Sequence, residues 1–217
     1  MTPIEQIQMQ LGAANEQVRL LMKDYRSKAY ADAEAEALGL ERRLAEAKGE
    51  AYAVPLELPI RWDIGAPLPH VFVNDRRTFL TFYVKGPPDP KWDGSYVTVK
   101  KPGGGAAESL GLIEFTCCAS AKLGSPNDEV FHGHYLHGRG QEPYEAQLVK
   151  NSPWIAELRN VNAVHGMFRP EGWDSLNHYV FWFHDSTFEC VAEGYRVELH
   201  QTSMQDLAAE IIKRLFL

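Results

Sequence analysis

Residues 177–200, with the sequence NHYVFWFHDSTFECVAEGYRVELH, contain the clearest strand pattern in the chain. Because the side chains of a strand alternate between its two faces, four residues of this stretch would share one face: His178, Val180, Trp182 and His184. An unbroken strand from His178 to Cys190 would have about twice the usual length. We therefore predict a turn or bulge at His184-Asp185-Ser186 and a second break near Glu193-Gly194.

Other strands are predicted before this stretch. Residues 77–84 (RTFLTFYV) are rich in β-branched and aromatic residues, which is typical of a strand buried on both faces. Residues 54–60 alternate with period two, but Pro55 and Pro59 cannot donate to a strand ladder, so we expect an edge strand or an extended entry segment. Two further strands are predicted, over residues 95–101 and 110–121, with a turn at 89–94 and a glycine-rich linker at 102–107.

Helix signals follow in the carboxy-terminal half. Ser152 and Pro153 form a predicted helix start, with serine as the N-cap, proline at the first helical position and Gly166 as the stop. Ser203 followed by Asp206 resembles a capping box at the start of a final helix. The apolar face of that helix is made of Met204, Leu207, Ala208, Ile211, Ile212 and Leu215. Strands in the middle and helices around them predict an α+β fold, with a largely antiparallel twisted sheet flanked by helices.

The first 50 residues have a different pattern, with a heptad-like seam made of Ile4, Ile7, Leu11, Ala14, Val18, Leu21 and Tyr25. A second helical piece runs from about residue 31 to 48, so we expect a helical hairpin or one long helix. The seam either folds onto the chain's own sheet or pairs with a second copy in a homodimer. We therefore divide the chain into a helical segment for packing or oligomerisation, residues 1–50, and an α+β domain that carries the site, residues 51–217.

Composition narrows the class of protein. A net charge of -7 and a pI near 5.6 argue against a nucleic acid or an anionic membrane as the main partner. The amino end lacks the basic and apolar runs of a signal peptide, and no apolar stretch is long enough to cross a bilayer. Three cysteines do not make a disulfide framework, so we expect reduced thiols in a cytoplasmic protein.

Most of the eight histidines lie between Gly124 and Cys190, beside acids, amides and an arginine. His132, His134 and His137 have HxHxxH spacing. In an extended segment the first two imidazoles would project to one side, where they would bind one divalent metal ion together with a further ligand. The spacing therefore predicts a divalent metal site as one possible function of the histidine cluster.

Proton transfer is the other use. His134 and His184 would handle protons or act as ligands, and Asp128 and Asp185 would orient them. Arg139 would either grip an anionic substrate group or form an internal pair with Asp128. The predicted substrate-binding residues are Arg139, Asn127 and Trp182. No serine stands in a Gly-x-Ser-x-Gly elbow, so covalent catalysis is not predicted.

Four segments resemble signature segments of an uncharacterised bacterial protein family. They are GSPNDE (124–129), GHYLHGRG (133–140), NSPWI (151–155) and FHDSTFEC (183–190). The resemblance covers about residues 60–195 and leaves the amino-terminal helices outside. It implies a bacterial, cytoplasmic protein, and it implies no substrate because no activity is attached to that family.

Two functions follow as alternatives. The first is a small-molecule enzyme with a histidine–carboxylate site and acid–base or metal-assisted chemistry of hydrolase or lyase type. It requires four side chains to converge in one pocket: Asp128, His134, Arg139 and His184. The second is a non-catalytic binding or interaction module, of accessory or immunity type, that associates through its amino-terminal helices. No dinucleotide or phosphate-loop fingerprint is present, so no cofactor beyond a divalent metal ion is predicted.

Overall fold

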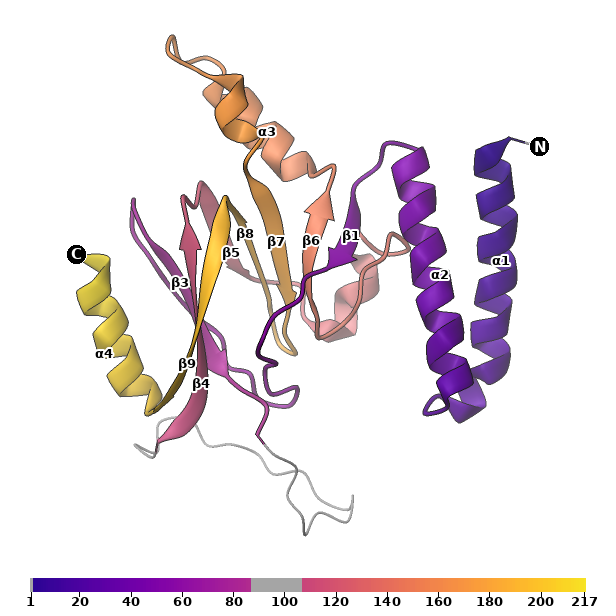
Figure 1. Ribbon diagram of the computed structural model, residues 1–217, viewed down its shortest axis with the longest axis horizontal. Helices are drawn as coiled ribbons and strands as arrows, with labels where there is room; N and C mark the ends of the chain where they lie inside the picture. The colour runs from indigo at the N-terminus through magenta and orange to yellow at the C-terminus, as the bar shows by residue number, and fades with distance from the viewer. Residues whose placement is uncertain (1, 87–106) are drawn as a thin grey trace.

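The computed structural model describes residues 2–86 and 107–217, and within them two antiparallel sheets pack face to face (Figure 1). The large sheet has the strand order β1-β6-β7-β8-β5, and the small sheet has the order β2-β3-β4-β9. The predicted α+β class with antiparallel strands and flanking helices is confirmed, although the strands form two sheets. The turn at 89–94, the strand at 95–101 and nearly all of the linker at 102–107 lie outside the described residues.

The strands are β1 Tyr52–Pro55, β2 His70–Val73, β3 Thr78–Tyr83, β4 Glu108–Thr116, β5 Ser120–Gly124, β6 Ala146–Lys150, β7 Asn177–Trp182, β8 Thr187–Ala192 and β9 Gly194–Thr202. The α-helices are α1 Pro3–Leu21, α2 Lys28–Ala47, α3 Pro153–Asn162 and α4 Met204–Leu215. In the described part of the chain there are also three short 3₁₀ helices: η1 Met22–Asp24, η2 Asp128–Gly133 and η3 Pro170–Trp173.

The two breaks predicted within residues 177–200 are confirmed. The first is the turn between β7 and β8, where the Phe183 N–H donates to the Ser186 carbonyl at 3.0 Å. The second separates β8 from β9 at Glu193, and it moves the chain from the large sheet to the small one. One stretch of sequence therefore supplies strands to both sheets.

The single strand predicted over residues 110–121 is wrong. The chain forms β4 in the small sheet and β5 in the large one, with a corner between them. Cys117 has φ 49°, a left-handed conformation that strands do not contain, so the ladder ends there. The reason lies in the second sheet, which β5 joins by pairing with β8.

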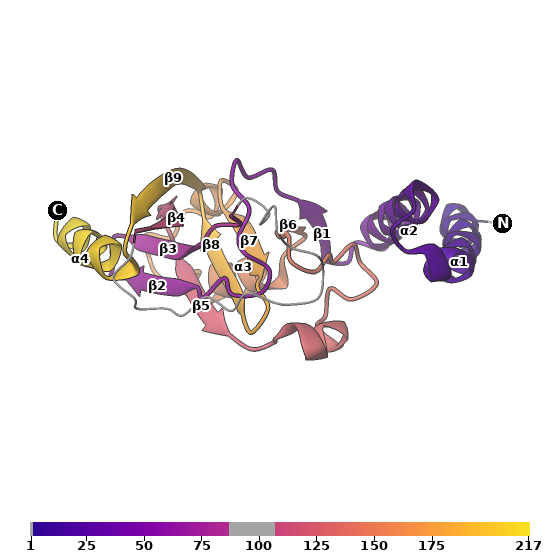
Figure 2. The ribbon, with the colours of Figure 1, turned by 90° about the horizontal axis from the view of Figure 1, so that it is seen from below.

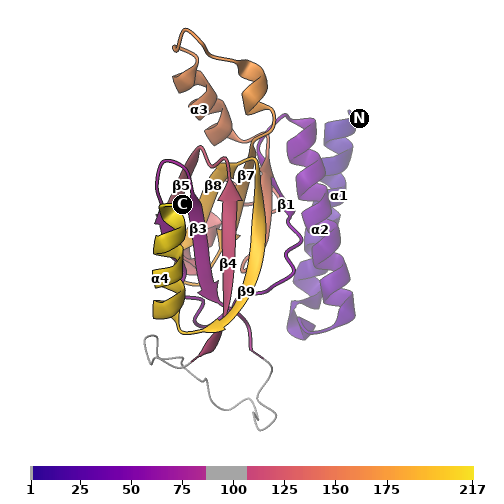
Figure 3. The ribbon, with the colours of Figure 1, turned by 60° about the vertical axis from the view of Figure 1, so that its left-hand side comes forward.

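The core between the sheets is largely aromatic. Trp62, Phe82, Phe115, Phe181, Phe183 and Phe188 fill it, and the Trp62 and Phe183 ring centroids are 4.9 Å apart. Every residue of β3 is buried, as predicted, because one face of the strand meets this core and the other meets α4. Figure 3 shows α4 alongside the small sheet.

Helix α4 starts at the predicted cap, where the Asp206 N–H donates to the Ser203 hydroxyl at 3.1 Å. Leu207 and Ile211 are fully buried against the outer face of the small sheet. Ile212, predicted on the buried face, is 48% exposed, because one residue turns about 100° around a helix. The buried stripe is therefore narrower than the sequence pattern indicates.

Helix α3 begins as predicted but ends early. The Ile155 N–H donates to the Ser152 hydroxyl at 3.2 Å, which confirms the N-cap. The predicted stop at Gly166 is wrong, because the helix ends at Asn162. There the Ala163 N–H is shared between the Arg159 carbonyl at 3.0 Å and the Asn160 carbonyl at 3.3 Å, a bifurcated bond that is common at helix ends.

The amino-terminal segment is a helical hairpin, and its seam faces α2 of the same chain. Ala14 of α1 is buried with Ala37 and Leu40 of α2, and other seam residues pack partly against them. Figures 1 and 2 show α2 between α1 and the large sheet, at the opposite end of the molecule from α4. The alternative prediction, that the seam packs directly on the chain's own sheet, is therefore wrong. The predicted homodimer through the amino-terminal helices stays a prediction.

Arg42 joins this hairpin to the sheet. Its guanidinium donates to the Ala53 carbonyl at 2.9 Å, to the Gly140 carbonyl at 3.2 Å and to the Glu142 carboxylate. Gly140 has φ 80°, and a Cβ there would lie 2.5 Å from Arg42 Cγ, so only glycine fits.

Within the described residues, no helix is long and apolar enough to cross a membrane.

We expect Leu207→Ala to lower the free energy of unfolding by about 2–5 kcal/mol, because it opens a cavity under α4. Ile212→Ala removes a similar side chain from the exposed side of the same helix. It should change the free energy of unfolding by less than about 0.5 kcal/mol. Urea denaturation followed by circular dichroism measures both values. Equal losses would contradict the assignment of the buried face.

Candidate functional site

Two predicted catalytic residues, 56 positions apart in sequence, lie in contact. His184 follows β7 in the hairpin turn, and Asp128 begins η2. The Asp128 N–H donates to the His184 carbonyl at 3.0 Å, and His184 Nδ1 lies 2.6 Å from Asp128 Oδ2. Backbone and side chain thus both hold this pair, which we call the dyad.

Tyr144 completes the dyad and was not predicted. Its hydroxyl donates to Asp128 Oδ2 at 2.6 Å, and its φ of 60° is a left-handed conformation that is rare for a bulky residue. The hydrogen bond from Tyr144, helped by His184, lowers the pKa of Asp128, and the same bond raises the pKa of Tyr144 to about 12. The carboxylate therefore stays ionised and the phenol stays protonated at neutral pH.

An ionised Asp128 fixes the tautomer of His184. The carboxylate accepts from Nδ1, so that nitrogen carries the proton and Nε2 presents its lone pair. The His184 side chain is 43% exposed, and no residue of the described ranges bonds Nε2. The dyad therefore offers an oriented base at the surface.

A cleft of about 520 Å³ lies beside the dyad. Tyr144 and its neighbours Pro143 and Glu145 form one wall, and the extended segment of residues 55–64 forms the other. Tyr144 thus joins the cleft to Asp128. The volume is in the range typical of small-molecule sites.

The expected convergence of Asp128, His134, Arg139 and His184 in one pocket is wrong, because the structure brings only Asp128 and His184 into contact. The remaining predicted catalytic and binding residues do not join the dyad. Asp185 is exposed and lines a second hollow, of about 320 Å³, together with Leu68 and His70. Arg139 pairs with Glu50 at 3.4 Å, so the internal partner expected for it, Asp128, is wrong. The Ala53 N–H donates to the Arg139 carbonyl at 2.9 Å, which holds that residue beside β1.

Asn127 and Trp182 take structural positions. Asn127 is the N-cap residue of η2, although its side chain makes no capping hydrogen bond. Trp182 is buried on the outer face of the large sheet, and its indole N–H donates to Gln147 at 3.0 Å. Their predicted roles in substrate binding stay predictions without a supporting contact.

The three histidines of the HxHxxH pattern do not lie in an extended segment. His132 is in η2, and His134 and His137 occupy the turn that follows, so the premise that two imidazoles project together is wrong. Burial lowers the pKa of His134 to about 4, and its ring packs edge-on to Trp182 at 4.8 Å. In the described part of the chain, no group of three or more His, Cys, Asp or Glu side chains is arranged for a metal ion.

A buried polar chain crosses the outer face of the large sheet, and the sequence did not reveal it. It runs from the Lys122 ammonium to Glu189, from Glu189 to His178 Nε2 and from His178 Nδ1 to the Ser152 hydroxyl, with each contact at 2.8 Å. Burial alone would raise the pKa of Glu189, but the hydrogen bonds from His178 and Lys122 outweigh it and lower that pKa. We name these four residues the buried chain.

The buried chain is fully bonded, and it is closed over except at its Lys122 end, where the side chain is 57% exposed. Ser152 is also the N-cap of α3, and Trp154 of that helix packs against His178 with ring centroids 5.2 Å apart. The Lys122 ammonium lies 4.7 Å from the Trp154 ring centroid. Buried charges are stable only when they are paired in this way. The arrangement therefore ties α3 to three strands, and the open site is the dyad.

No disulfide joins Cys117, Cys118 or Cys190. A hydrogen bond with Cys190 is the main cause that lowers the pKa of Cys118 to about 7, against the opposing effect of burial. The exposed Cys117 beside it has a raised pKa, mainly because of a hydrogen bond with Glu193. The two adjacent thiols therefore differ in reactivity.

Comparisons of this chain with protein-family models, with curated proteins and with solved structures each gave no match. The resemblance to a bacterial family stays a prediction. The described residues define the class: an α+β protein of two packed sheets with an exposed histidine–aspartate dyad beside a cleft. Any function must be argued from that geometry.

We expect Glu189→Gln to lower the free energy of unfolding by about 3–5 kcal/mol at neutral pH, because His178 and Lys122 lose a buried partner. Since the folded-state pKa of Glu189 is lowered, its stabilisation is present above the unfolded pKa and is lost as pH falls through the folded one. Lys122→Gln, at a mostly exposed position, should cost at most about 1 kcal/mol. Urea denaturation at several pH values measures both, and a pH-independent difference would contradict this assignment.

Alkylation should distinguish the cysteines. With iodoacetamide, the rate at Cys118 should rise with pH to a midpoint of about 7, because the thiolate is the nucleophile. The rate at Cys117 should still be rising well above that pH. Peptide mass spectrometry of samples quenched over time reads both rates, and a shared midpoint would show that Cys190 has no effect on Cys118.

Proposed function

We propose that this protein is a small-molecule enzyme that uses His184 as general base and general acid, with hydrolase-type or lyase-type chemistry. The observation that carries the proposal is the 2.6 Å contact between His184 Nδ1 and Asp128, on a ring that is only partly covered. A base oriented by a carboxylate, with its second nitrogen open, is the arrangement that general acid–base catalysis needs.

Each residue of the site has a distinct role. His184 Nε2 takes a proton from water or from the substrate, and the resulting imidazolium returns it to the leaving group. Asp128 is a positioning residue that stabilises this imidazolium. The hydrogen bond from Tyr144 keeps Asp128 a weak base, so that the proton stays on His184.

The cleft beside Tyr144 is the proposed place for the substrate, a small molecule from the cytoplasm. Its volume of about 520 Å³ suits such a ligand. We give the predicted metal ion no step, because His134 packs against Trp182 and does not face His132 and His137 as a ligand set would. Acid–base chemistry at His184 needs no contribution from those three histidines.

One observation favours the alternative, a non-catalytic interaction module. Val161, Val164 and Met167 are exposed at the end of α3 and in the turn beyond it, and Val164 is 89% exposed. Figures 1 and 3 show this region projecting past the ends of the strands. Such a patch suits a protein partner. It does not account for the oriented dyad, so we rank this function second.

The proposal predicts turnover by the purified protein. A panel of p-nitrophenyl esters, p-nitroanilides, p-nitrophenyl phosphates and hydroxy acids covers hydrolysis and elimination. We expect His184→Gln to lower kcat/KM on the accepted class at least about 100-fold, the usual contribution of a positioned base. Asp128→Asn should lower kcat more than it changes KM, because it misorients the imidazole.

His200 provides the matched control. It also pairs with a carboxylate, with Nε2 3.0 Å from Glu198, but it lies on β9 of the small sheet. His200→Gln should leave turnover unchanged. A wild-type protein that converts nothing in the panel, or a His184→Gln variant within twofold of wild type, would overturn the proposal and favour the interaction module.

A further inference from the structure

We infer that the cleft binds a small monocarboxylate with an apolar body, and that the Lys85 ammonium receives its carboxylate. This inference rests on the proposed function, because it names the substrate class for the His184 site. It depends on two features of the cleft: its apolar walls and the pairing of its charges.

The walls supply the apolar surface. Leu56, Leu58 and Ile60 lie in the extended segment and pack partly against the core, and Ile64 continues the lining. The segment is held to the opposite wall by the Leu56 N–H, which donates to the Ala146 carbonyl at 2.9 Å. A ligand body of similar character would be released from water on binding there.

The charges that line the cleft are unequally paired. Arg61 binds Glu145 at 3.2 Å, and both side chains are well exposed, so this pair sits at the rim and is internally neutral. Lys85 is exposed, and within the described ranges no acidic group forms an ion pair with it. The backbone N–H of Lys85 donates to the backbone carbonyl of Arg61 at 2.9 Å, which places the two cationic residues side by side.

Glu57 is the remaining charged residue of the lining. It stands between Leu56 and Leu58 in the extended segment, and it is exposed while they are partly buried. Since side chains alternate in an extended chain, its carboxylate leaves the backbone on the side opposite these leucines. Lys85 is therefore the charged group best placed to act with the apolar wall.

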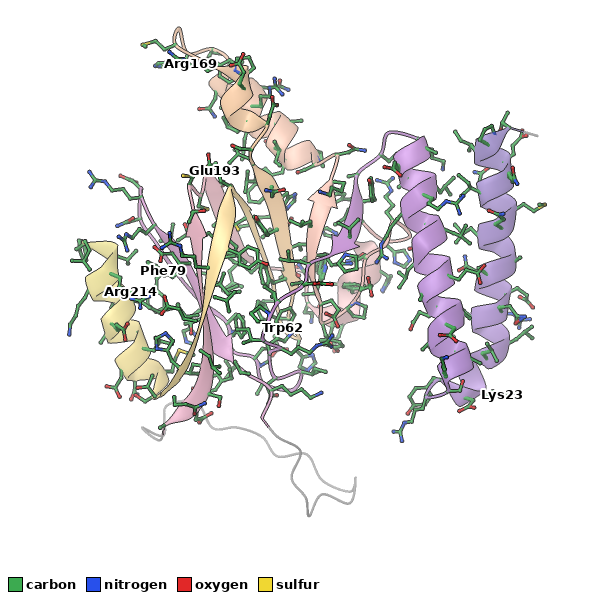
Figure 4. The ribbon with its side chains drawn as sticks, in the orientation of Figure 1. Lys23, Trp62, Phe79, Arg169, Glu193 and Arg214 are labelled. Carbon is green, nitrogen blue, oxygen red and sulfur yellow. The ribbon has the colours of Figure 1, made fainter. Side chains whose placement is uncertain are left out.

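Trp62 adds apolar surface. It lines the cleft and reaches the core between the sheets (Figure 4), while its Nε1–H is buried and not open to the cleft. One ammonium beside an already paired guanidinium matches a single carboxylate. A phosphate dianion would need more positive charge than this.

A matched set of three probes tests the inference: 4-phenylbutanoate, 4-phenylbutanol and 4-phenylbutylamine. They share one apolar body and differ only in the head group. Isothermal titration calorimetry on the full chain should give the tightest binding for the carboxylate. Lys85→Gln should weaken that binding about tenfold, as expected for the loss of one charge-assisted hydrogen bond, and leave the alcohol unchanged.

Two controls separate the cleft from general charge effects. Lys48→Gln removes an exposed lysine after α2 and should leave carboxylate binding unchanged. Glu57→Gln should also leave it within twofold. The inference would be overturned if the amine bound most tightly or if Glu57→Gln weakened binding of the amine. It would also be overturned if Lys85→Gln bound the carboxylate as the wild type does, or if no probe bound.

The His184→Gln variant keeps the two proposals distinguishable. It should still bind 4-phenylbutanoate, because the substitution leaves Lys85 and the apolar wall of the cleft in place. Selective carboxylate binding together with turnover that is insensitive to His184 would overturn the enzyme proposal alone. His184-dependent turnover of a substrate class without a carboxylate would overturn the ligand inference alone.

Discussion

The buried carboxylate of Glu189 is the constraint on which the large sheet depends. A charge on the outer face of a sheet, covered by a helix, is stable only with partners, and Glu189 takes them from two other elements: Lys122 of β5 and His178 of β7. His178 in turn bonds Ser152, which begins α3. The register of the β7–β8 hairpin is thereby set at its far end. The turn of that hairpin carries His184, so the same constraint helps to position the dyad.

The dyad shows how the loops of one sheet produce chemistry that no single segment holds. Asp128 comes after β5, Tyr144 comes before β6 and His184 comes after β7, and all three meet at one end of the large sheet. The left-handed conformation of Tyr144 aims its hydroxyl at Asp128 and leaves the residue on the wall of the cleft. The site thus combines an ionised carboxylate, an oriented imidazole and an adjacent apolar hollow.

Local patterns predicted much of the fold. The alternation in residues 177–183, the burial of β3 and the caps at Ser152 and Ser203 were recoverable because each depends on residues within a few positions. The corner at Cys117 and the pairing of Arg139 with Glu50 were not, since they depend on the second sheet and on α2. For the site, sequence reasoning identified Asp128 and His184 by residue type. It missed Tyr144 at the site, and outside the site it missed the contact of His178 with Ser152, because these partners are distant in sequence.

The amino-acid sequence by itself determined which segments become strands and helices, which faces are apolar and which residues have the chemistry to act as acids or bases. These properties follow from side-chain type and spacing along a short stretch of chain. Only the tertiary structure decided that His184 meets Asp128, that His134 packs against Trp182 and that Arg139 pairs with Glu50. The physical reason is that a hydrogen bond requires two groups within about 3 Å. Distances of that kind are fixed by how the sheets, loops and helices pack, and spacing along the chain does not encode them.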